Sequence, residues 1–191
     1  MDTILDELFS SNTRSKILKL FFRNSEKNFS IKEVADRIRA DYYAVRREIF
    51  KLESIKILEV KADRTQKLYF LNSSFAFLGE LRSLVLHSSP ISQDKLHEKL
   101  KNLGKFKLII LSGIFIGSDK SRLDLFLVGN NVKEKTLGKF LLEIEAEVGK
   151  EIDYVLFSEE EFRYRKNMFD KLVLEALEGP KKVLVDKLGV I

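Results

Sequence analysis

The stretch from Ser30 to Leu71, SIKEVADRIRADYYAVRREIFKLESIKILEVKADRTQKLYFL, decides the fold of this chain. Ser30 is followed three residues later by Glu33, which is the capping-box signature of a helix start. Asp41 is suited to cap a second helix, in which apolar residues recur at helical spacing at Val45, Ile49 and Leu52. The stretch therefore predicts two helices separated by a short turn.

The remainder of the stretch predicts a β-hairpin. Residues 57–61 and 67–71 are strand-like runs on either side of a polar turn at residues 62–66. Helix, turn, helix and hairpin, in that order, form the plan of a winged helix-turn-helix, whose second helix lies in the DNA major groove. The face of that helix opposite its apolar stripe carries Tyr42, Tyr43, Arg46, Arg47, Phe50 and Lys51.

This part of the chain resembles the arsenic-repressor-like winged-helix transcriptional regulators. The resemblance rests on residues 31–38, residues 41–52, and the segment Ile55-Lys56-Ile57-Leu58-Glu59 that leads into the wing. Such regulators often have glycine in the turn between the helices and before the wing, where this chain has Arg39 and Lys56. A positive φ at either position would be costlier here than in a chain with glycine.

The distribution of charge agrees with an anionic partner. The chain has 34 Lys and Arg against 29 Asp and Glu, a net charge of +5. Residues 1–72 hold 15 basic against 11 acidic side chains, and the rest hold 19 against 18, so the excess lies with the helix-turn-helix. An ordinary solvated surface is the alternative interpretation. The predicted DNA-binding residues are Tyr42, Tyr43, Arg46, Arg47 and Lys51 on the helix and Lys61, Arg64 and Lys67 on the wing.

Composition excludes several kinds of chemistry. The chain has no Cys, so disulfides, thiolate metal sites and cysteine nucleophiles are excluded. His87 and His97 form no metal-ligand pattern, and we expect no metal and no cofactor. The chain shows no signal peptide, and its longest apolar run, beginning at Leu108, is too short to span a bilayer. We therefore expect a cytoplasmic protein that does not engage a membrane.

From Ile91 onwards, strand-like and helix-like segments alternate. Residues 105–116, 123–128 and 151–157 are predicted strands, with helices between and after them. The predicted fold class is α+β, with a winged helix-turn-helix at residues 1–73, a connecting helix and break at 74–90, and a small α/β domain with a mixed sheet at 91–191.

The second domain contains Ser112-Gly113, then Ser121-Arg122-Leu123-Asp124 entering a strand, and later Asp153. This pattern resembles the small DNA-polymerase-beta-like nucleotidyltransferase domains over residues 91–191. The resemblance implies that Asp124 and Asp153 match the second and third carboxylates of that family, which hold metal ions. Arg122 stands where the first carboxylate would be, and its permanent positive charge repels a metal.

We therefore expect a catalytically inactive nucleotidyltransferase-like domain. Ser112 and Gly113 invert the family's Gly-Ser pair, and the apolar residues 114–116 are expected to continue the strand. Asp124 and Asp153 are expected to be solvated strand residues.

Together these patterns predict a DNA-binding transcriptional regulator whose second domain serves assembly or senses a nucleotide or protein ligand. The alternatives are a nucleotidyltransferase or antitoxin-type enzyme that the winged helix targets, and a protein-binding adaptor. We expect double-stranded DNA as a partner and a homodimer, because two-fold DNA sites favour a two-fold protein. The candidate dimer residues are Phe77, Leu81, Leu84 and Val85, or Ile4, Leu5, Leu8 and Phe9.

Overall fold

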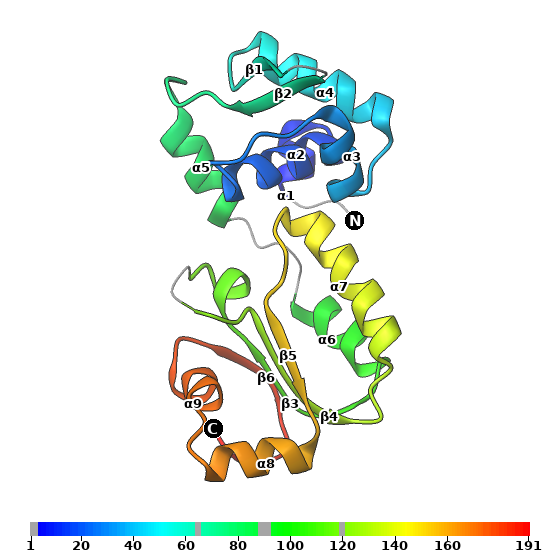
Figure 1. Cartoon of the computed structure of the whole chain (residues 1–191), viewed down its shortest axis with the longest axis vertical. Helices are drawn as coiled ribbons and strands as arrows, with labels where there is room; N and C mark the ends of the chain where they lie inside the picture. Colours follow the sequence, from blue (N-terminus) through cyan, green and yellow to red (C-terminus); the bar gives the residue numbers. More distant parts are fainter. Residues whose placement is uncertain (1–3, 64–65, 88–92, 119–120) are drawn as a thin grey trace. The chain divides into compact units, whose positions relative to one another are not determined.

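A computed structural model describes residues 4–63, 66–87, 93–118 and 121–191 (Figure 1). The chain divides into two compact units: unit 1 comprises residues 1–90 and 142–151, and unit 2 comprises residues 91–141 and 152–191. N-terminal helices and a β-hairpin precede a mixed four-stranded sheet with helices. The predicted α+β class and mixed sheet are thus confirmed at this level.

Unit 1 begins with four helices: α1 (Ile4–Phe9), α2 (Asn12–Arg23), α3 (Ile31–Ile38) and α4 (Tyr42–Ser54). The predicted capping box is present at α3, where the Glu33 amide donates to Ser30 Oγ at 3.3 Å and the Ser30 amide donates to Glu33 Oε2 at 2.7 Å. Asp41 caps α4, since its carboxylate accepts from the Ala44 amide at 2.9 Å. Both helix starts are therefore confirmed.

Helix α2 is the centre of the core of unit 1. Ile17, Leu20 and Phe22 are each at most 1% exposed, and the side chain of Lys19 between them is buried as well. Burial lowers the pKa of the Lys19 amine, and the nearby Asp6 carboxylate opposes this effect. The helix is thus enclosed on nearly all sides, which its alternation of Lys and apolar residues did not predict.

The hairpin consists of β1 (Leu58–Asp63) and β2 (Gln66–Leu71), paired antiparallel with Leu58 opposite Leu71 and Asp63 opposite Gln66. The predicted turn at 62–66 was too long, because Ala62, Asp63 and Gln66 pair within the strands. Phe29, just before α3, adds a bridge to β2: its amide donates to the Tyr69 carbonyl at 2.9 Å, and its carbonyl accepts from the Tyr69 amide at 2.8 Å. The hairpin is thereby attached to the helices. After it comes α5 (Leu78–His87).

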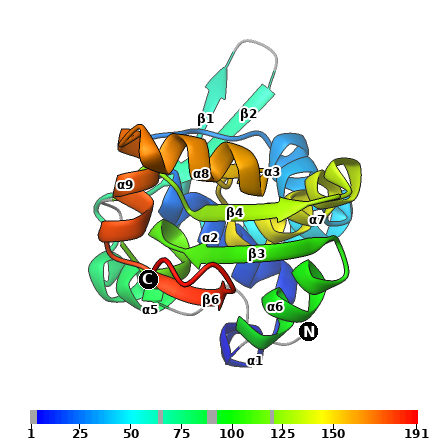
Figure 2. The same cartoon turned by 90° about the horizontal axis from the view of Figure 1, so that it is seen from below.

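The elements of unit 2 surround a sheet with the strand order β5-β4-β3-β6. Strand β3 (Lys105–Leu111) is antiparallel to β4 (Leu125–Asn130) and to β6 (Lys182–Asp186), and β4 is parallel to β5 (Tyr154–Phe157). Figure 2 shows β3 between β4 and β6. The helices are α6 (Gln93–Lys101), α7 (Glu134–Val148), which crosses from unit 2 into unit 1, α8 (Glu159–Asn167) and α9 (Lys171–Glu178).

Both faces of this sheet are buried. On one face, Leu108, Ile110 and Phe126 form a cluster with Phe162 of α8 and Val173 of α9. The alternate residues Ile109 and Leu127 are also at most 1% exposed, although they point to the opposite face. This two-sided burial explains why these strands are continuous apolar runs in the sequence.

Three of the strands predicted in unit 2 have wrong boundaries. The strand expected at 123–128 is Leu125–Asn130. The strand expected at 105–116 ends at Leu111, and Gly113–Ile116 form a short 3-10 helix. Gly113 has φ 49°, a left-handed conformation that turns the chain out of the strand direction. The strand expected at 151–157 begins only at Tyr154.

Within the described residues, no helix has both the length and the apolar character needed to cross a bilayer.

Arg39 and Lys56 both adopt the left-handed backbone conformation, with φ of 51° and 65°. These are the two positions at which winged-helix regulators often have glycine. Each one ends a helix. The turn lets the Ala40 amide donate back to the Ala35 carbonyl at 3.1 Å and the Ile57 amide to the Leu52 carbonyl at 3.0 Å. The helix ends are thus satisfied by hydrogen bonds that require a backbone conformation unfavourable for Arg and Lys.

We expect Arg39→Gly and Lys56→Gly each to raise the free energy of unfolding by about 0.5–1 kcal/mol. A left-handed conformation costs an L residue about 1–2 kcal/mol, and the greater freedom of glycine in the unfolded chain cancels only part of that gain. Urea unfolding measures the change. Lys32→Gly inside α3 is the matched control and should destabilise. Destabilisation by all three variants would contradict the strain that we assign to Arg39 and Lys56.

Candidate functional site

Helix α4 has a buried face and an opposite exposed face. Val45, Ile49 and Leu52 are at most 1% exposed and pack into the core. Tyr43 is 67% exposed, and Arg46 and Arg47 are exposed on the same side of the helix. The predicted residues Tyr42, Tyr43, Arg46 and Arg47 therefore lie together on one solvent-facing stripe, as residues three and four apart do on a helix.

Aromatic rings and guanidinium groups are interleaved along this stripe. The rings of Tyr42 and Tyr43 meet edge to face with centroids 5.5 Å apart. The guanidinium of Arg46 lies 5.2 Å from the ring centroid of Phe50, which is 41% exposed. In the part of the chain that the structure describes, the side chain of Arg47 makes no hydrogen bond or ion pair. Its donors are thus available to an external acceptor.

Lys51, the fifth predicted helix residue, lies on the flank of α4. Its ammonium donates to Glu48 Oε1 at 3.2 Å. It also borders an apolar groove with Leu52 and Ile55. Lys51 follows Arg47 by one helical turn, so it lies at the edge of the stripe that is nearest to this groove.

The predicted wing residues do not share one face of the hairpin. Lys61 is opposite Leu68, and Lys67 is opposite Ala62, so the pleat points the two lysines to opposite faces. Lys61 lies over Phe70, with its ammonium 5.9 Å from the ring centroid. Lys67 is on the face of Tyr69, which packs into the core of unit 1. Arg64 lies outside the described residues.

The charge environment of Tyr69 shows which face of the hairpin is turned towards α4. Burial is the main cause that raises the pKa of the Tyr69 hydroxyl, and Glu53 and Tyr42 of α4 raise it further. Side chains of α4 are therefore near the face that Tyr69 and Lys67 share.

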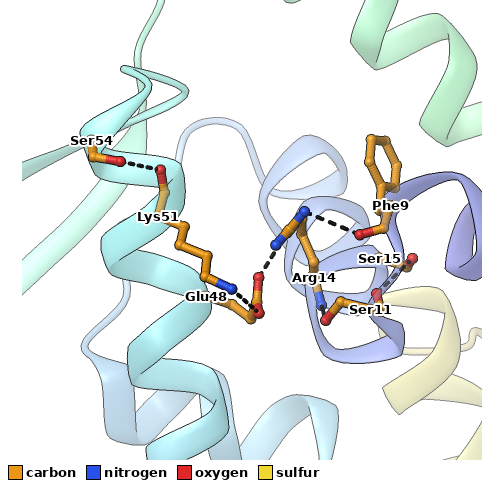
Figure 3. A network of polar contacts seen from close by, with 7 residues as sticks. All are labelled: Phe9, Ser11, Arg14, Ser15, Glu48, Lys51 and Ser54. Carbon is orange, nitrogen blue, oxygen red and sulfur yellow. Dashed lines mark hydrogen bonds and ion pairs between the residues drawn. The ribbon is translucent and has the colours of Figure 1, made fainter.

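Glu48, which the sequence analysis did not single out, connects α4 to α2 (Figure 3). It lies on the core side of α4 and is 8% exposed. Its carboxylate accepts from Arg14 Nε at 2.7 Å, and Arg14 Nη1 also donates to the Phe9 carbonyl at 3.0 Å. A carboxylate within an apolar stripe needs a partner to be buried, which is the signal that sequence reasoning should have used.

The protonation of Glu48 is coupled to this network. Burial alone would raise the pKa of its carboxyl group, but the hydrogen bonds from Arg14 and Lys51 outweigh burial, so the pKa lies below its ordinary value. The charged form is therefore the one that the fold stabilises.

The predicted dimer residues divide into three kinds: buried, half-buried and exposed. Phe9 and Leu81 are half-buried and pack against the core of unit 1. Leu5 and Val85 are at most 1% exposed, so they belong to the core of unit 1 and cannot form an interface, which corrects the prediction. An amphipathic helix turns residues three and four apart towards the core, and Leu5 and Val85 occupy such inward positions on their helices. The exposed candidates are Ile4 at 84%, Leu8 at 58%, Phe77 at 65% and Leu84 at 45%.

In unit 2, Asp124 is not solvated as predicted. It precedes β4 and is only 2% exposed. Its Oδ1 accepts from the Ile114 amide at 2.8 Å, and its Oδ2 accepts from the Asp153 amide at 3.1 Å. The carboxylate therefore joins the 3-10 helix to the start of β5. Asp153 is exposed, as predicted.

Gly113 and Ser112 complete this junction. A Cβ atom on Gly113 would lie 2.1 Å from Asp124 Oδ1, so only glycine fits against the carboxylate. The Ser112 hydroxyl donates to the Leu123 carbonyl at 2.7 Å. Three of the residues expected at a vestigial site, Ser112, Gly113 and Asp124, are thus packed against one another.

Arg122 lies beside this junction and points towards α9. Its guanidinium is 3.8 Å from Glu175 Oε2, and the side chain is 68% exposed. It borders a cavity of about 490 Å³ that Glu175 and Glu178 also line. Among the described residues, no group of three or more His, Cys, Asp or Glu side chains is arranged to hold a metal ion.

Comparisons with protein-family models, with curated proteins and with solved structures returned no match to this chain. The function therefore has to be argued from the geometry of the two units.

We expect Glu48→Gln to lower the free energy of unfolding at pH 7 by about 1–3 kcal/mol, because charge-assisted hydrogen bonds from Arg14 and Lys51 are weakened. A carboxyl group whose pKa is lowered by folding stabilises the protein above its unfolded pKa, and that contribution is lost as the pH falls through the folded pKa. The stability difference between the two proteins should therefore shrink in acid. Urea unfolding at pH 7 and pH 3 measures it.

Glu53→Gln is the matched control for this experiment. Glu53 is on the same helix, and its side chain makes no hydrogen bond or ion pair within the described residues. A destabilisation by Glu53→Gln as large as that by Glu48→Gln would contradict the role of the network.

Proposed function

We propose that unit 1 is a winged helix-turn-helix that binds double-stranded DNA, with α4 as the recognition helix and the hairpin as the wing. The observation that carries the proposal is the exposed stripe of α4, where Tyr43, Arg46 and Arg47 face solvent opposite an entirely buried side. Arginine is the residue that most often reads guanine edges in the major groove, and it binds phosphate equally well. The basic excess in residues 1–72 supports the same proposal.

The pleat of the hairpin indicates which lysine of the wing is nearer to a bound duplex. Lys67 is on the face turned towards α4, and Lys61 is on the opposite face. A duplex that contacts α4 is therefore closer to Lys67 than to Lys61. In this proposal the protein acts as a transcriptional regulator and binds DNA as a homodimer, with the exposed residues Leu8, Phe77 and Leu84 available for the dimer interface.

We expect Arg46→Ala and Arg47→Ala each to weaken binding to a preferred duplex by about 1–3 kcal/mol if they contact base edges. Lys67→Ala should weaken binding to all duplexes and reduce the salt dependence, whereas Lys61→Ala should have a smaller effect. Genomic fragments retained by the protein supply the preferred duplex, and titrations at several salt concentrations measure affinity, salt dependence and the number of chains bound.

Lys61→Ala and Lys67→Ala form a matched pair, because both remove one exposed positive charge from the same hairpin. Equal effects of the two variants would contradict the assigned orientation of the wing. Unchanged affinity in Arg46→Ala and Arg47→Ala would contradict the proposed DNA-binding face, and retention of a protein partner with no DNA would favour the adaptor alternative.

We further propose that unit 2 does not transfer nucleotides and instead serves assembly or ligand sensing. Both oxygens of Asp124 already accept backbone hydrogen bonds, and Gly113 packs against the carboxylate. Arg122 brings a permanent positive charge to the side where a metal would be needed. These contacts favour a structural role for Asp124. The cavity beside Arg122 is where a ligand of unit 2 would bind.

We expect no incorporation of label from any of the four radiolabelled nucleoside triphosphates into protein or tRNA, with Mg²⁺ or Mn²⁺ present. Asp124→Ala should instead lower the free energy of unfolding by about 1–3 kcal/mol, because it leaves the Ile114 and Asp153 amides without their acceptor. Labelled product from the natural chain that disappears in Asp124→Ala would establish the enzyme alternative.

A further inference from the structure

An apolar groove of about 350 Å³ lies in unit 1 at the C-terminal end of α4. Its walls come from four helices and the start of the hairpin, and most of them are aliphatic or aromatic. The volume lies within the range of small-molecule sites in proteins. The lining residues are Phe9, Arg14, Leu18, Lys51, Leu52, Ser54, Ile55, Ile57 and Leu81.

The charged side chains at this groove carry a net positive charge. Arg14 and Lys51 are cations that line it, and the carboxylate that faces both of them is Glu48. The three groups therefore sum to +1. Arg14 uses Nε for Glu48 and Nη1 for the Phe9 carbonyl, which leaves Nη2 without a protein acceptor among the described residues. The Lys51 side chain is 61% exposed and also has donors to spare.

We propose that this groove binds an amphipathic carboxylate, a small molecule with an aliphatic or aromatic body and one acidic head. The body would contact Leu18, Leu52 and Leu81, and the carboxylate would accept hydrogen bonds from Arg14 and Lys51. Guanidinium groups match carboxylates in geometry as well as in charge. An amine of the same shape would meet two cations.

The position of the head group gives the ligand a route to α4. Arg14 is the residue that holds Glu48 of α4, as Figure 3 shows. A carboxylate bound to the remaining donors of Arg14 and Lys51 places a second negative charge beside Glu48. Repulsion between the two carboxylates weakens the hold of Arg14 on Glu48, so ligand binding loosens the contact between α2 and α4. This step rests on the proposed DNA binding: the ligand weakens DNA binding, and DNA weakens ligand binding by the same factor.

Three probes of equal chain length test the site: octanoate, octanol and octylammonium, each titrated into the full chain by calorimetry below micellar concentrations. We expect octanoate to bind at least tenfold more tightly than octanol, and octylammonium more weakly than octanol. Equal affinities for all three, or no binding of octanoate, would overturn the proposal.

Variants locate the binding. Leu81→Trp should fill the groove and abolish octanoate binding, whereas Ser83→Trp, at an exposed position on the same helix outside the groove, should leave it unchanged. Ile55→Trp, at a position 57% exposed on the rim, fills the groove from the other side if Leu81→Trp does not fold. Arg14→Gln should reduce octanoate affinity to that of octanol while octanol binding persists, which reports that the groove is intact. Octanoate binding that survives both groove-filling variants would overturn the proposed location.

The effect on DNA is measured separately. Octanoate at saturation should weaken binding to the preferred duplex, and Leu81→Trp should remove this response without removing DNA binding. Octanoate binding in the absence of DNA supports the ligand site even if the chain binds no duplex. Failure of the DNA proposal therefore gives a different result from failure of the ligand site. DNA affinity unchanged by bound octanoate would overturn the coupling.

Discussion

The ion pair between Arg14 and Glu48 is the constraint on which the arrangement of unit 1 depends. A helix that packs through aliphatic residues alone can rotate or slide with little loss of contact, because dispersion and burial are not directional. The 2.7 Å hydrogen bond from Arg14 Nε to Glu48 is directional and lies beside the core. Removing either partner would leave the other charge poorly solvated. The pair therefore sets which side of α4 faces outwards.

The same logic of fixed contacts applies at the ends of the helices. Arg39 and Lys56 adopt a left-handed backbone that glycine would adopt without strain, and in return the helices end with backbone hydrogen bonds. The first of these turns orients α3 against α4, and the second directs the chain into β1. The exposed stripe of Tyr43, Arg46 and Arg47 is thus held by a partly buried ion pair on one side and by two tight turns at the ends.

Unit 2 uses a carboxylate in another way. The order Ser112-Gly113, Asp124 and Asp153 in the sequence led us to expect positions that correspond to the metal ligands of nucleotidyltransferase domains. In the structure, Asp124 instead accepts two backbone amides and packs on Gly113. Backbone N–H groups that donate to a buried carboxylate stabilise its charged form. The order of these residues along the chain did not reveal which contacts they make.

The sequence by itself determined the features that depend on local chemistry. Capping at Ser30 and Asp41, the apolar spacing of α4 and the continuous apolar runs in the strands of unit 2 all lie within a few neighbouring residues, and they indicated the α+β class. Only the tertiary structure decided the partner of Glu48, the opposite faces of Lys61 and Lys67, and the burial of Asp124. The contact of Glu48 with Arg14 joins residues 34 positions apart, and the contact of Asp124 with Ile114 joins residues 10 positions apart. The faces of Lys61 and Lys67 depend on the register of the hairpin, which a shift of one residue would invert.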